Sequence, residues 1–72
     1  MKSLDLHGIK HEDVKRVLDE FFWEMMKKNV SYFEVITGFS DRMKSIVYET
    51  CDEYGFEVEE NPGNGGSLTI FC

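Results

Sequence analysis

The sequence predicts an α+β two-layer sandwich of element order βαβαββ, in which a four-stranded mixed sheet carries two helices on one face. Two segments have apolar residues at helical spacing, and four shorter ones alternate or are rich in β-branched and aromatic residues. Because strand–helix–strand crossovers are right-handed, both helices should cover the same face and leave the other open. The 72 residues suffice for one domain, which we place over residues 1–72.

The first strand is expected over Ser3–His7, where apolar and polar residues alternate before a glycine. Its two leucines point to one side of the sheet and Asp5 and His7 to the other. If the leucines face the helices, Asp5 and His7 project from the open face or its rim.

The first helix is expected over Lys10–Asn29, with acidic residues in its first turn and lysines in its last, as the helix dipole favours. Lys10 or His11 stands where an N-capping side chain would be expected, so the cap is weak. The apolar stripe of this helix comprises Val14, Val17, Leu18, Phe21, Phe22 and Met25.

The second half of the chain predicts one strand, one helix and a hairpin. The strand covers Tyr32–Thr37, and its composition is typical of a central strand. Ser40 or Asp41 can cap the helix that follows and runs to Tyr54. The hairpin has strands at residues 56–60 and 67–71. Its loop, Asn61–Gly66, is glycine-rich but matches no P-loop, so we interpret it as a plain connection.

Composition restricts the function. The net charge is −6, with 14 acidic and 8 basic residues, which argues against broad attraction to nucleic acid but not against a local basic patch. No apolar run is long enough for a membrane span, and no secretory signal precedes the first strand, so we expect a cytoplasmic protein without a membrane partner. In that compartment Cys51 and Cys72 should be reduced thiols.

Asp5 and His7 are the residues best suited to chemistry. Histidine exchanges protons near neutral pH, so His7 could deprotonate a ribose 2′-hydroxyl or protonate a leaving oxygen in RNA cleavage. Asp5 could orient the imidazole or stabilise its protonated form. The alternative is that both are solvated polar residues at a strand end. His11 is interpreted as a surface histidine at the start of a helix.

Three segments together resemble the Smr (small MutS-related) domain family. They are "LDLHG" before the first helix, "VITG" before the second helix and "GNGGSLTIF" as the closing strand, and the resemblance covers residues 3–71. It implies a fold similar to the C-terminal domain of a bacterial translation initiation factor. It also implies nucleic-acid binding or endonuclease activity, with the aspartate and histidine of the D-x-H motif linked to activity. These match Asp5 and His7.

The second motif departs from the family pattern. In the family it runs Thr-Gly-Lys/Arg-Gly, often followed by His-Ser, whereas here Phe39 and Ser40 replace the basic residue and the second glycine. Arg42 or Lys44, in the first turn of the next helix, could replace the missing cation. Phe39 could stack on a base or pack on a protein; Tyr32 and Trp23 are further candidates for stacking.

The assigned site follows from these arguments. Asp5 and His7 are the candidate catalytic pair. The candidate nucleic-acid-binding residues are Gly8, Thr37, Gly38, Phe39, Arg42 and Lys44. No His, Cys, Asp and Glu set has metal-ligand spacing, so no cofactor is assigned; a divalent ion such as magnesium, held between Asp5 and a substrate phosphate, stays open.

Two functions follow from the sequence. The first is an Smr-like domain that binds nucleic acid and acts as an endonuclease, cleaving RNA or nicking branched or nicked DNA. The alternative is a non-catalytic Smr-like module that binds a protein or ribonucleoprotein partner such as the ribosome. The first motif favours the nuclease, and the net charge and the altered second motif favour the binding module.

Overall fold

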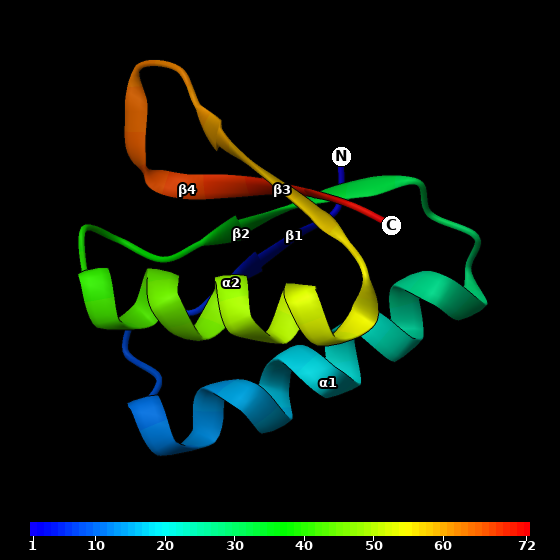
Figure 1. Cartoon of the computed structure of the whole chain (residues 1–72), viewed down its shortest axis with the longest axis horizontal. Coiled ribbons are helices and arrows are strands. Elements are labelled where there is room, and N and C mark those ends of the chain that lie inside the picture. Colours follow the sequence, from blue (N-terminus) through cyan, green and yellow to red (C-terminus); the bar gives the residue numbers. More distant parts are fainter.

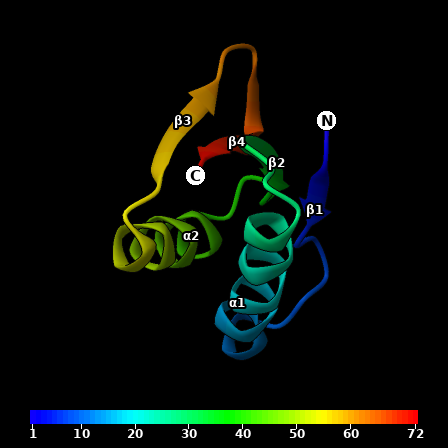
Figure 2. The ribbon, with the colours of Figure 1, turned by 90° about the vertical axis from the view of Figure 1, so that its right-hand side faces the viewer.

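The computed structural model describes residues 1–72 and has the predicted element order (Figure 1). Its elements are β1 (Ser3–Asp5), α1 (His11–Lys27), β2 (Tyr32–Ile36), α2 (Asp41–Tyr54), β3 (Glu57–Asn61) and β4 (Asn64–Phe71). Both helices lie on one side of the sheet, and the other side is uncovered (Figure 2). The two-layer α+β architecture is thereby confirmed.

The sheet is mixed, as predicted. Its strand order is β1-β2-β4-β3, with β1 parallel to β2 and the other two pairs antiparallel. The order places β2 at the centre, so its inward side chains Phe33 and Val35 are buried under the helices. Because β1 and β2 are parallel, their carboxyl ends lie at the same edge of the sheet.

The first strand is shorter than predicted. It ends at Asp5 because the chain turns there: the Asp5 carboxylate accepts a hydrogen bond from the backbone N–H of His7 at 2.8 Å. Gly8 completes the turn with a φ of 85°, a conformation that favours glycine. Leu6 is fully buried and Asp5 and His7 are exposed, as the alternation predicts, but His7 lies in the turn and not on the strand.

The helix ends follow the capping residues. Ser40 caps α2, because its hydroxyl accepts a hydrogen bond from the backbone N–H of Met43 at 3.1 Å. Gly55 closes α2 in the left-handed conformation, with a φ of 75°. No side chain caps α1 at Lys10. This helix ends earlier than predicted, because Asn29 adopts a left-handed φ of 56°.

The closing hairpin differs most from the prediction. In place of a loop over residues 61–66, two residues, Pro62 and Gly63, join β3 to β4. Proline followed by a glycine of φ 76° is typical of a type II turn. The register shifts between Glu60, which pairs with Leu68, and Asn61, which pairs with Asn64, so residues 65–67 have no partner on β3. This irregular stretch carries two glycines toward the edge where β2 ends.

The fold should lose stability in alkali. Burial raises the pKa of the Cys51 thiol from the usual 9.0 to about 12, and desolvation with a hydrogen bond to Asp19 raises the pKa of Tyr54. Both groups hold their protons more tightly in the folded state, so the stability they contribute is fully present below about pH 9 and is lost as the pH rises. Cys51 alone should account for up to about 1.4 kcal/mol per pH unit.

Urea denaturation from pH 7 to 11, under reducing conditions, measures this loss. The variant Cys51→Ala should show a shallower fall than the unmodified protein, because the thiol term is absent. Equal slopes for the two proteins would contradict the assignment to Cys51.

Candidate functional site

The carboxyl ends of β1 and β2 meet at one edge of the sheet. Asp5 pairs with Ile36, and the backbone N–H of Leu6 donates to the Ile36 carbonyl at 2.9 Å. The turn that carries His7 therefore lies next to Gly38, and α1 and α2 both begin beside it (Figure 1). We call this region, formed by residues 5–8, 37–39 and 65–66, the carboxyl edge. It unites the first two motifs of the sequence.

Gly66 joins the closing strand to this edge. The backbone N–H groups of Thr37 and Gly38 both donate to the Gly66 carbonyl, each at 2.9 Å. The Thr37 hydroxyl donates to the Gly38 carbonyl at 2.8 Å and reaches that of Gly66 at 3.3 Å. The threonine side chain is 3% exposed, so it holds the backbone in place and is not itself offered to a ligand.

Gly65 makes room for Phe39. A Cβ on Gly65 would stand 3.2 Å from Cε1 of Phe39, which is closer than ordinary contact, so the ring edge lies over a backbone without a side chain. Sequence reasoning assigned neither Gly65 nor Gly66 to the site. The signal was there, since the resemblance included this glycine pair, but the pair was interpreted as part of a plain hairpin.

Phe39 is the one exposed aromatic residue at the carboxyl edge. Its side chain is 82% exposed, and the Lys44 ammonium lies 6.0 Å from the ring centroid, within the range of a cation–π contact. Tyr32 and Trp23, the other candidates for stacking, are also exposed. However, Tyr32 starts β2 at the opposite end of the strand, and Trp23 lies within α1 near Tyr54, away from the edge.

The basic residues divide into paired and unpaired ones. Lys15, Arg16 and Lys28 form ion pairs with carboxylates of the helices. The remaining cations, which form no ion pair, are Lys2, Lys10, Lys27, Arg42 and Lys44. Three of them, Lys10, Arg42 and Lys44, stand where α1 and α2 begin, next to the carboxyl edge. Despite the net charge of −6, cations are therefore available at this edge, together with the carboxylates of Asp5, Glu12 and Asp41.

Asp5 and His7 are joined through the backbone. The Asp5 carboxylate binds the N–H of His7, so it fixes the turn that presents the imidazole and makes no hydrogen bond with the ring. The His7 side chain is exposed and has no hydrogen-bond partner in the fold. The imidazole is thus open to a substrate, while Asp5 acts on its position.

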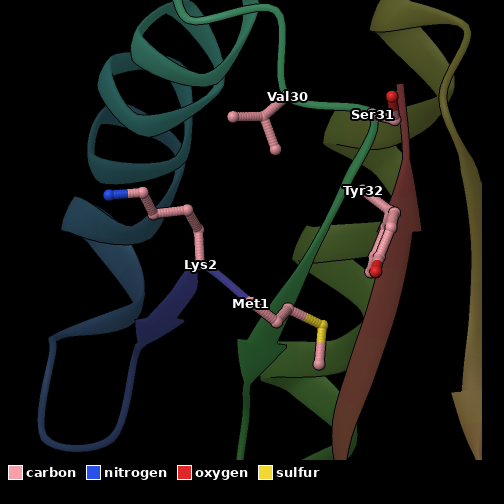
Figure 3. A pocket seen from close by; sticks show the side chains of 5 residues that line it. All are labelled: Met1, Lys2, Val30, Ser31 and Tyr32. Atoms are coloured by element: carbon pink, nitrogen blue, oxygen red, sulfur yellow. The ribbon is translucent and has the colours of Figure 1, made fainter.

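Other parts of the surface offer less. No group of three His, Cys, Asp or Glu side chains is arranged to hold a metal ion. A hollow at the start of α1 is lined by Ile9, Lys10, His11 and Glu12, which places His11 close to the carboxyl edge. A second hollow, lined by Met1, Lys2, Val30, Ser31 and Tyr32, lies at the opposite ends of β1 and β2 and holds none of the assigned residues (Figure 3). Neither helix has the length and apolar character that a membrane crossing requires.

Comparison with known families gives one match. A family model described as Smr domain matches residues 4–67, a span that includes the D-x-H turn, the Thr-Gly motif and the glycine pair of β4. No curated protein and no solved structure matches the chain.

Proposed function

Because the chain belongs to the Smr domain family, which is associated with nucleic-acid binding and nuclease activity, we propose that it binds RNA, or a branched or nicked DNA, and cleaves it. The bound strand would follow the carboxyl edge. Asp5 and His7 would form the cleavage site, and the residues that hold the strand would be Gly8, Gly38, Phe39, Arg42 and Lys44. Thr37 would support Gly38.

One observation carries this proposal: the exposed imidazole of His7, the Gly38 backbone and three unpaired cations lie along one edge of the sheet. Phosphates of a single strand repeat at a spacing that an edge of this kind can follow, and both helices begin there, with their N-terminal ends favouring anions. The cations supply the electrostatic part of binding that the net charge withholds elsewhere.

His7 supplies a route to RNA cleavage. Acting as a general base, its imidazole takes the proton of a ribose 2′-hydroxyl, whose oxygen attacks the adjacent phosphorus as the bond to the 5′-oxygen breaks. The products are a 2′,3′-cyclic phosphate and a 5′-hydroxyl, whose proton comes from solvent or from the imidazolium. Asp5 contributes by holding the His7 backbone, so its expected role is positioning.

The test is direct. The protein is incubated with end-labelled single-stranded RNA and with supercoiled plasmid, each with and without magnesium. Cleavage of RNA that stops when the ribose 2′-hydroxyl at the cut is replaced by hydrogen supports the histidine route. Nicking of plasmid, which has no 2′-hydroxyl, would assign a hydrolytic reaction in its place.

Phe39 should contribute a stacking contact. Replacing it with alanine is expected to weaken binding of a labelled single-stranded oligoribonucleotide by about 5- to 150-fold, because stacking of one base contributes about 1–3 kcal/mol. Fluorescence anisotropy at fixed salt measures the change. Trp23→Ala is the matched control, since Trp23 is 60% exposed but lies away from the edge, and it should bind as the unmodified protein does. Equal losses in both variants would contradict the placement of the strand.

The second candidate function is a non-catalytic module that binds a protein or ribonucleoprotein. The observation that favours it is Phe39, an exposed ring where the family carries a cation. Under this function RNA and plasmid would stay intact at high protein excess, with and without magnesium.

A further inference from the structure

The uncovered side of the sheet is a surface of its own. Strand alternation turns Phe33, Val35, Leu68 and Ile70 toward the helices, where they are fully or almost fully buried. The residues between them point the other way, where no helix lies (Figure 2). We call this surface the open face; it comprises Ser3, Asp5, Tyr32, Glu34, Ile36, Glu57, Glu59, Thr69 and Phe71.

The carboxylates of the open face have no cations. Every ion pair in the fold involves a carboxylate of α1 or α2, and Glu34, Glu57 and Glu59 form none. The open face contains no lysine, arginine or histidine. The nearest positive groups are the amino group of Met1 and the side chain of Lys2, at one corner, and Lys2 points away from Tyr32, toward α1 (Figure 3).

Two rows of side chains cross this face from strand to strand. In the first row Glu34 on β2 pairs with Thr69 on β4, which pairs with Glu59 on β3. Neighbouring strands lie about 4.8 Å apart, so the two glutamates flank the small Thr69 at about 10 Å from each other. A cationic side chain reaching down onto Thr69 would lie between two carboxylates.

The second row is aromatic. Tyr32 pairs with Phe71, which pairs with Glu57, and the two ring centroids are 6.1 Å apart. The rings are 50% and 39% exposed. Such a pair accepts the aliphatic stem of lysine or the planar head of arginine, and Glu57 stands next to it to meet the charge.

We propose that the open face binds a basic, lysine- and arginine-containing segment of a partner protein. Nucleic acid does not suit it, because phosphates would face uncompensated carboxylates. A second copy of this chain does not suit it either, because a symmetric contact would oppose the same glutamates to each other. The protein partner would thus occupy a different surface from the nucleic acid of the proposed function, on which this inference does not depend.

The experiment uses the full chain and a synthetic fluorescein-labelled peptide in which lysine and arginine alternate with leucine and serine. Saturable binding is expected, with amide chemical-shift changes confined to β2, β3 and β4. The variant Glu34→Lys/Glu59→Lys should weaken binding by about 10-fold or more, because both carboxylates that flank Thr69 are lost. The control Glu49→Lys/Asp52→Lys alters the charge equally on exposed, unpaired residues of α2 and should change affinity by no more than about 2-fold.

The outcomes are separable. Equal weakening in both variants would overturn the proposal in favour of bulk charge attraction, as would shift changes on the helices or no binding at millimolar peptide. Self-association of the unmodified chain through β3 and β4 would assign the face to a second copy. If the lysine variant fails to fold, Glu34→Gln/Glu59→Gln removes the same charges without adding new ones. RNA binding should be retained in these variants; its loss would overturn the separation of the two surfaces.

Discussion

Replacement of Phe22 by alanine is expected to lower the free energy of unfolding by about 3–5 kcal/mol. Phe22 is fully buried on α1 and lies at the centre of an aromatic cluster. Its ring centroid is 5.5 Å from that of Phe33 in the sheet, 5.1 Å from that of Tyr54 on α2 and 5.3 Å from that of Phe56. One side chain therefore joins both helices to the sheet.

The loss should be severe for a chain of 72 residues. Domains carry about 0.05–0.15 kcal/mol of stability per residue, so the expected cost is a large share of the whole. Urea denaturation followed by far-ultraviolet circular dichroism measures it. Trp23→Ala, which removes a larger but exposed ring from the next position, should cost less than about 1 kcal/mol. A Phe22→Ala loss below about 1.5 kcal/mol would mean that the cluster closes over the cavity.

The architecture was predictable because it depends on local patterns. The apolar stripe of α1 placed Phe21 and Phe22 in the core, and the β-branched and aromatic run of β2 placed that strand at the centre. Where the prediction was wrong, a side chain or a register decided the outcome. The hydrogen bond from His7 to Asp5 ends β1 early, and the shift beside Asn61 lets β4 begin three residues sooner.

The candidate site was predictable only in part. The D-x-H and Thr-Gly motifs are visible in the sequence, and the parallel pairing of β1 and β2 brings them together. The contact of Gly66 with Gly38 is not visible, because it joins residues 28 positions apart through a strand register that no local pattern reports. The same holds for the carboxylates of Glu34 and Glu59, which become neighbours only through Thr69.

Replacement of His7 by alanine is expected to lower the rate of RNA cleavage by about 10²–10⁴-fold, the range that a general acid–base group contributes. The affinity for RNA should change little, because the imidazole is exposed and the cations and Phe39 remain. Single-turnover cleavage of labelled RNA, with anisotropy for binding, separates the two quantities. His11→Ala is the matched control, since it removes the other histidine at the start of α1 and should leave the rate within about 3-fold.

Substitutions at Asp5 then separate position from charge. In Asp5→Asn the amide oxygen can still accept the hydrogen bond from the His7 N–H, so a residue that only positions the turn would be replaced with little loss of rate. Asp5→Ala removes the acceptor and should slow cleavage while the pH profile keeps its shape. If Asp5→Asn is as slow as Asp5→Ala, the negative charge itself takes part, as a partner of the imidazolium or as a ligand for magnesium. If cleavage survives His7→Ala unchanged, the imidazole is not the catalytic base, and the carboxyl edge binds nucleic acid without cutting it.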